Sequence, residues 1–205
     1  MNQLGFVVKG RGHYMNEVIN QRIVETAEQL FHVRGYKSVT MNDLSNALGM
    51  SKRTLYQYFR SKEEVATCVV DNLLQRITHP MDEIQLKPDP IKGLRETVNR
   101  VKDEYVQLNP VFLEDLQKSL PELWKRVENV RGEKFQKMVE AALQEAQNQG
   151  HALNFNPHVA AAVLVASAQA VIQPEFFIRN GFTANEVVDT LIGIFTTAFS
   201  VNGSD

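Results

Sequence analysis

Residues 40–59 read TMNDLSNALGMSKRTLYQYF, and this stretch decides the fold of the N-terminal part of the chain. Thr40 followed three residues later by Asp43 is the pattern of a capping box, so a helix is predicted to begin directly after it. Gly49 predicts the end of that helix, because glycine readily takes the left-handed conformation that closes a helix. Ser51 then caps another short helix. Two short helices joined by a tight turn are typical of a helix-turn-helix.

The second of these helices, predicted over 52–59, has one apolar and one polar face. Leu55 and Phe59 are four residues apart and are predicted to pack inward. Their burial turns a polar set outward or to the flanks: Lys52, Arg53, Thr54, Tyr56, Gln57 and Tyr58. Lys and Arg suit guanine or phosphate, Gln suits adenine, and hydroxyl groups suit phosphate oxygens. The pattern favours a helix that enters the major groove of DNA, and the alternative is an ordinary helical corner with a solvated face.

The charge distribution separates the N-terminal part of the chain from the rest. Residues 1–62 hold nine Lys and Arg against four acidic residues, a net charge of +5. The remaining residues hold 13 basic and 20 acidic residues, a net charge of −7. A basic N-terminal part joined to an acidic remainder indicates a polyanionic partner at one end, or else a chance drift in charge.

The rest of the chain predicts an all-α fold, because apolar residues recur at spacings of three and four and no long stretch alternates with a period of two. Ser61 and Glu64 repeat the capping-box pattern and predict a helix that ends near Pro80. Later helices are separated by proline and glycine. Pro174 is predicted to bend the apolar helix that opens after Asn156.

The last helix, after Thr183, carries two apolar stripes. One contains Val187, Leu191, Ile194 and Ala198, and the other contains Val188, Ile192, Phe195 and Phe199. One stripe can pack within the subunit, and the second is predicted to contact a second copy of the chain. We assign Val188, Ile192, Phe195 and Phe199 to this dimer interface, with burial of both stripes inside one subunit as the alternative.

The stretch from Ile19 through Val69, containing LFHVRGYKSVTMNDLSNALGMSKRTLYQYFRSKEEV, resembles the DNA-binding domain of the TetR family of regulators over about 50 of 205 residues. The resemblance implies a nine-helix, Ω-like homodimer whose third helix reads DNA, a C-terminal ligand-binding domain, and usually repression. By position it assigns phosphate contacts to Thr40, Tyr56, Tyr58 and Lys62, and places Lys52, Arg53, Thr54 and Gln57 on the reading surface. Arg53 departs from the small residue that is frequent there, which leaves the base preference open.

The predicted division of labour follows this resemblance. Residues 1–62 are expected to bind DNA, and residues 63–205 to bind an effector and to form the dimer. Candidate ligand-binding residues are polar or aromatic side chains on otherwise apolar faces: Tyr105, Trp124, Gln169 and Gln173. Each has a plain alternative, since Tyr105 and Trp124 also suit a core, and the two amides can satisfy each other or the backbone.

Other classes of function find little support in the sequence. The five histidines form no HExxH pair, Cys68 has no nearby His, and no glycine-rich phosphate loop is present, so we expect neither an enzyme nor a metal or other cofactor. The absence of an export signal or a membrane-spanning apolar run predicts a cytoplasmic protein. Met15 is a candidate natural start, with residues 1–14 as an upstream extension.

The sequence therefore predicts a sequence-specific transcriptional regulator that binds a palindromic DNA operator as a homodimer. It is expected to be a repressor that a small-molecule effector releases. Two alternatives remain open at this point: a regulator that answers to a partner protein or to no ligand, and a helical interaction module that does not bind DNA.

Overall fold

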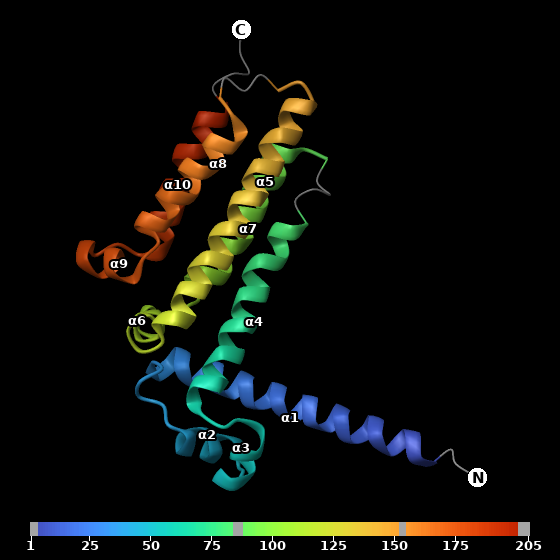
Figure 1. Ribbon diagram of the computed structural model, residues 1–205. Coiled ribbons are helices and arrows are strands. Elements are labelled where there is room, and N and C mark those ends of the chain that lie inside the picture. The colour runs from blue at the N-terminus through green and yellow to red at the C-terminus, as the bar shows by residue number, and fades with distance from the viewer. Residues whose placement is uncertain (1–3, 84–87, 152–154, 201–205) are drawn as a thin grey trace. The chain divides into compact units, whose positions relative to one another are not determined.

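The computed structural model describes residues 4–83, 88–151 and 155–200, and within them the side chains of 4–14, 106, 196 and 198–200 are not described. These described ranges form ten helices and contain no strand (Figure 1). The predicted all-α class is confirmed. The chain divides into two compact units, residues 1–72 and 73–205.

The first unit contains α1 (Leu4–Arg34), α2 (Met41–Leu48), α3 (Lys52–Tyr58) and the beginning of α4 (Lys62–Asp82). Its core consists of fully buried apolar side chains from all four helices: Ile23, Phe31, Leu44, Leu55 and Val65. α2 packs against both α1 and α3. The short helices are thus held by tertiary packing, which they need because helices of two turns are marginal alone.

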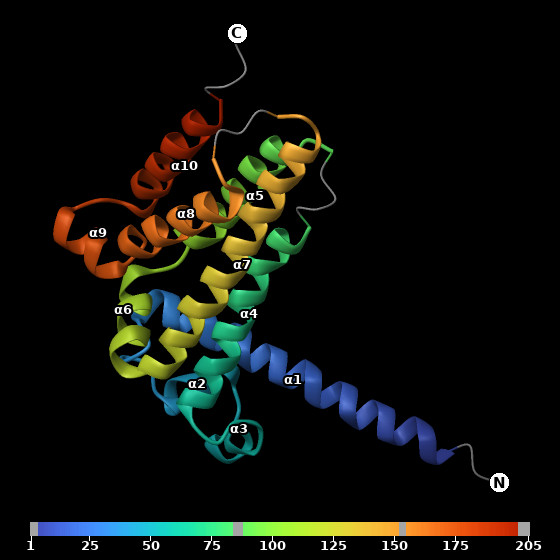
Figure 2. The ribbon, with the colours of Figure 1, turned by 45° about the horizontal axis from the view of Figure 1, so that its top comes forward.

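The second unit contains the remainder of α4 followed by α5 (Pro90–Val106), α6 (Pro110–Ser119), α7 (Pro121–Asn148), α8 (Pro157–Val171), α9 (Pro174–Asn180) and α10 (Ala184–Ser200). α7 is the central element, with α5, α6 and α8 packed along it, while α10 packs against α5 and α8 (Figure 2). Two long helices, α5 and α7, therefore form one wall of the unit, and α8 and α10 form another.

Proline and asparagine or aspartate set the beginnings of the helices in this unit. Asp89, Asn109 and Asn156 each cap a helix whose first residue is proline, and each side chain accepts hydrogen bonds from the first turn. Pro174 begins α9, which is bent by 59° from α8. The predicted bend is confirmed. It also accounts for the helix count, since the ten helices include α8 and α9, which the sequence analysis treats as one bent helix.

In the described part of the chain no single helix is long and apolar enough to cross a membrane. The bent pair α8 and α9 passes the same length and composition test only when the two helices are taken together.

Candidate functional site

The turn between α2 and α3 is built by backbone hydrogen bonds and local caps. The Asp43 backbone N–H donates to Thr40 Oγ1 at 3.2 Å, and the Thr40 N–H donates to Asp43 Oδ2 at 2.8 Å, which completes the capping box. Gly49 has a φ of 66°, in the left-handed region, and ends α2. Ser51 Oγ accepts a hydrogen bond from the Thr54 N–H at 3.0 Å and begins α3. The sequence-predicted helix-turn-helix is present with its expected caps.

α3 presents a polar face to solvent. Leu55 is fully buried and Phe59, directly after the helix, is 5% exposed, so the opposite face of α3 points outward. Lys52, Arg53, Tyr56 and Gln57 are exposed, while Thr54 and Tyr58 are half-buried at the flanks. This is the orientation that the sequence predicts. Tyr56 is 48% exposed, which is a large exposed fraction for an aromatic side chain and is compatible with a contact to a partner.

Two of the expected phosphate-contacting residues have structural tasks as well. Thr40 Oγ1 is used by the capping box, where the hydroxyl also donates to Asp43 Oδ2. Lys62 Nζ donates to the carbonyl oxygens of Tyr36 and Val39 at 3.0 and 2.9 Å, and it lies 4.1 Å from the centroid of the Tyr36 ring. Lys62 thus ties the beginning of α4 to the loop that leads into α2. Lys62 makes these contacts in the protein alone, without DNA.

The same loop is fixed by Tyr36. Its hydroxyl donates to Glu63 Oε1 at 3.3 Å, and its ring packs edge-on against Phe31 with centroids 5.4 Å apart. Burial, followed by the negative charge and hydrogen bond of Glu63, raises the pKa of Tyr36 to about 12. The capping-box hydrogen bonds from Thr40, with a smaller contribution from Arg34, lower the pKa of Asp43. The beginning of α2 is therefore held by contacts from α1, α4 and its own first turn.

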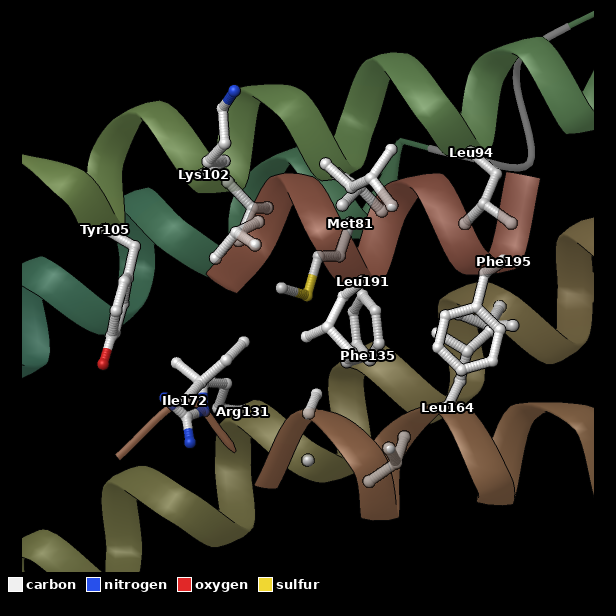
Figure 3. Close-up of a pocket in the computed structure, with 18 of the residues that line it drawn as sticks. Met81, Leu94, Lys102, Tyr105, Arg131, Phe135, Leu164, Ile172, Leu191 and Phe195 are labelled. Carbon is white, nitrogen blue, oxygen red and sulfur yellow. The ribbon is translucent and has the colours of Figure 1, made fainter. Parts of the chain in front are cut away.

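The second unit contains a cavity that is partly open to solvent, in which the centres of water-sized spheres can occupy about 120 Å³. Its wall comes from α4, α5, α7, α8, α10 and the residue that ends α8, and most of it is aliphatic and aromatic (Figure 3). The lining contains three basic residues and, within the described ranges, no acidic residue: Arg95, Lys102 and Arg131. Lys102 pairs with Asp189 at 2.8 Å, and Figure 3 shows its ammonium group pointing away from the cavity.

The cavity contains two of the four ligand-binding candidates. Tyr105 and Gln169 line it. Trp124 does not, because it precedes Arg131, the first lining residue of α7, by seven residues, about 10 Å along the helix. Gln173 does not line it either, because its amide donates to Glu128 Oε1 and to the Gln169 carbonyl oxygen, both at 2.9 Å. Gln173 thus follows the alternative expectation of a locally satisfied amide.

Part of the α10 stripe that is predicted to form a dimer interface lines the cavity. Val188, Ile192 and Phe195, expected at a dimer interface, line the cavity of their own subunit, and Val188 is only 6% exposed. The side chain of Phe199 lies outside the described residues. The exposed apolar side chains of α8 and α10 are instead Val159, Val163 and Ile194. The sequence shows that α10 is apolar on two sides, but which side faces its own subunit depends on the packing of α5 and α8.

Arg131 is a cavity residue that the sequence analysis missed. It lies on α7 four residues before Phe135, which also lines the cavity. A basic residue on an inward helical stripe is unusual, because a buried charge costs free energy unless it finds a partner. This basic residue within an apolar stripe is the sequence feature that could have identified Arg131 as a ligand-binding candidate.

The described residues contain no group of three or more His, Cys, Asp or Glu side chains that could hold a metal ion. Cys68 is half-buried, and burial together with the nearby charge of Glu64 raises the pKa of its thiol. A raised pKa keeps the thiol protonated and unreactive. The two candidate functional features of the described residues therefore remain the helix-turn-helix and the cavity of the second unit.

Comparison with known proteins agrees with the geometry of the first unit. The family described as "Bacterial regulatory proteins, tetR family" matches residues 23–67, which include α2 and α3. A relative in Bacillus subtilis, the uncharacterized HTH-type transcriptional regulator YvaF, is 27% identical over 178 residues, which are 86% of this chain and 93% of the relative. HTH-type transcriptional regulator EthR of Mycolicibacterium smegmatis is 30% identical over 37% of this chain and 36% of its own length.

Solved structures show the same fold over nearly the whole chain. A TetR/AcrR-family transcriptional regulator from Thermobifida fusca superposes with a TM-score of 0.67 at 21% identity, covering 91% of this chain and 98% of its own. SmeT, the repressor of the Stenotrophomonas maltophilia multidrug efflux pump SmeDEF, superposes with a TM-score of 0.68 at 18% identity, covering 90% of this chain and 94% of its own. These comparisons lead to one conclusion: residues 23–67 match the DNA-binding domain of the TetR family of helix-turn-helix transcriptional regulators, and the chain as a whole has the fold seen in such regulators.

Proposed function

We propose that the chain is a repressor that binds a palindromic DNA operator as a homodimer and leaves it when a small molecule fills the cavity of the second unit. The observation that carries this proposal is the exposed polar face of α3. In this proposal, residues 1–62 bind DNA in the cytoplasm, and residues 63–205 bind the effector and form the dimer.

The DNA contacts divide by chemistry. Lys52, Arg53 and Gln57 carry donors and acceptors that match base edges in the major groove, and we assign them to base reading. Thr54 lies beside them at the flank of α3. Tyr56 and Tyr58 are assigned to phosphate oxygens, together with the beginning of α2 at Thr40. The ammonium group of Lys62 donates to two backbone carbonyl oxygens, so we assign Lys62 first to positioning the beginning of α2. A contact between Lys62 and a DNA phosphate is its second proposed role.

Exposed apolar side chains on α8 and α10 support a dimer. Val159, Val163 and Ile194 are 58%, 53% and 59% exposed, on two helices that contact each other. Exposed apolar side chains on two helices that pack together are typical of a protein–protein interface. Two copies related by a twofold axis would bury the same face of each subunit and give two equivalent reading helices. A dimer of this kind selects a palindromic operator.

Selection of duplex DNA from a random pool tests the proposal. We expect an inverted repeat whose half-sites lie about one helical turn, ~34 Å, or somewhat more apart. Replacement of Arg53 by Ala should relax the preference at one base position per half-site by about 1–3 kcal/mol. Lys37→Ala is the matched control, since it removes an exposed positive charge outside α3 and should leave the base preference unchanged. A pool without sequence preference, or equal effects of both variants, would refute the assignment.

A further inference from the structure

We infer that the effector of this site is an amphipathic monoanion with an unbranched apolar tail, such as a medium-chain or long-chain carboxylate. The inference rests on the proposed function for its regulatory meaning, but the binding itself can be tested without DNA. It comes from one end of the cavity, where Tyr105 and Arg131 lie together (Figure 3).

Tyr105 offers a buried hydroxyl beside a positive charge. Its residue is 7% exposed, and its hydroxyl oxygen is buried and makes no hydrogen bond of regular geometry. Burial raises the pKa of Tyr105, and the neighbouring Arg131 partly offsets this rise. The ring is held edge-on against Phe177 with centroids 6.5 Å apart, which fixes the direction of the hydroxyl. Because a buried hydroxyl without a well-formed hydrogen bond costs free energy, a ligand oxygen that reaches both Tyr105 and Arg131 would be stabilised by groups that are already oriented.

Arg131 supplies the charge beside this hydroxyl. Its guanidinium carbon lies 6.0 Å from the centroid of the Tyr105 ring, and none of the described acidic groups forms an ion pair with it. Lys102, by contrast, is paired with Asp189. A guanidinium binds a carboxylate through two parallel hydrogen bonds, and such bonds are strong where water is excluded. The pair therefore suits an anionic head group with at least two oxygens.

The remainder of the cavity suits a hydrocarbon tail. Figure 3 shows Tyr105 and Arg131 at one end, and Leu94 and Phe195 at the other, with Met81, Phe135 and Leu191 between them. Along α5, Leu94 and Tyr105, the labelled residues at the two ends in Figure 3, are separated by a rise of about 16 Å, and the lining continues one turn further, to Ile91. A zigzag of carbon–carbon bonds of about 1.5 Å advances roughly 1.25 Å per bond, so this length corresponds to about 12 to 14 carbon atoms.

Calorimetric titration of the full-length chain provides the test. The probes are sodium octanoate, decanoate, dodecanoate and tetradecanoate, each below its micelle concentration, with 1-dodecanol and dodecyltrimethylammonium as neutral and cationic probes of the same tail. We expect the affinity for carboxylates to rise by about fourfold per methylene up to the length of the cavity. The dodecyl cation should bind at least 30-fold more weakly than dodecanoate.

Variants separate the head group from the tail. Arg131→Gln should weaken dodecanoate binding by at least 30-fold and Tyr105→Phe by about tenfold, while both keep the affinity for 1-dodecanol. Lys92→Gln is the matched control, because Lys92 is an exposed cation on α5 that does not line the cavity. It should change dodecanoate affinity by less than threefold. Thermal melting of each variant checks that the fold is retained.

Two outcomes would overturn the inference: equal binding of the anionic and cationic probes, or unchanged dodecanoate affinity in Arg131→Gln. Operator binding is measured separately by fluorescence anisotropy. If another small molecule releases the operator and no carboxylate binds, the proposed function stands and this inference fails. If dodecanoate binds as expected and the operator stays bound, the ligand class stands and regulation by release fails.

Discussion

Lys62 provides a sharp test of how the DNA-binding unit is held together. Lys62→Met keeps the length and apolar stem of the side chain and removes its ammonium group. The variant loses two hydrogen bonds to the carbonyl oxygens of Tyr36 and Val39, and the contact with the Tyr36 ring. Each charge-assisted hydrogen bond stabilises by about 1.5–3 kcal/mol when fully buried, and a cation–π contact by about 0.5–1 kcal/mol. Lys62 is half-buried, so its contacts are weaker than fully buried ones, and we expect a total loss of about 2–3 kcal/mol.

Urea unfolding followed by circular dichroism measures this loss, and hydrogen exchange at residues 36–40 locates it. DNA binding by the same variant distinguishes positioning from direct contact. If Lys62 positions the beginning of α2, affinity falls for every sequence while the slope of log affinity against log salt stays the same. If Lys62 contacts a phosphate, the slope decreases by about 0.9. Lys37→Met, a change of the same type on the same loop, is the control. Unchanged stability together with the smaller slope would refute the positioning role.

Four further predictions follow from the described contacts. Thr40→Ala should lower the free energy of unfolding by about 1 kcal/mol in urea titrations, since it removes the cap of α2. Gly49→Ala should cost about 1–2 kcal/mol from backbone strain alone, because an added Cβ at Gly49 meets no atom within 4 Å. Stability should fall as pH rises from 10 to 12, because the folded pKa of Tyr36 is about 12 and the unfolded value about 10; Tyr36→Phe should flatten this fall. Ile194→Asp or Val163→Asp should give folded monomers in sedimentation experiments, and persistent dimers would exclude this face.

The helix-turn-helix could be predicted from the sequence because its determinants are local. The Thr40–Asp43 box, Gly49 and the Ser51 cap act within four residues along the chain, so their residue types suffice to place helix ends. The faces of α3 follow from the spacing of Leu55 and Phe59 for the same reason. The bend at Pro174 is local as well, since proline lacks the N–H that would continue the helix.

The cavity could not be predicted in the same way, because its wall comes from helices that are far apart in the sequence. The periodicity of α10 reveals two apolar stripes, but only contacts with α5 and α8 determine that Val188, Ile192 and Phe195 face inward. Trp124 and Tyr105 are both buried aromatic residues, but only Tyr105 lines the cavity. The difference depends on where each residue lies along its helix, which the residue type does not reveal. Gln173 is predicted as a ligand contact because it lies on an otherwise apolar helix face. Its hydrogen-bond partner, Glu128, lies 45 residues away in the sequence and cannot be identified from local spacing.

α4 is the element through which the two proposed activities can influence each other. Its beginning carries Lys62, which holds the loop before α2, and its last turns carry Ile77 and Met81, which line the cavity. Pro80 lies inside the helix between these lining residues, where it removes a backbone hydrogen bond and makes this end of α4 easier to bend. A ligand that displaces Ile77 and Met81 therefore acts on the same helix that positions the DNA-binding residues. A coupling of about 1–3 kcal/mol would change operator affinity by about 5- to 150-fold, and linkage requires that the operator weaken ligand binding by the same factor. A ligand that bound equally well to the free and the operator-bound protein would shift nothing, so differential affinity and not tight binding decides whether a molecule is an effector.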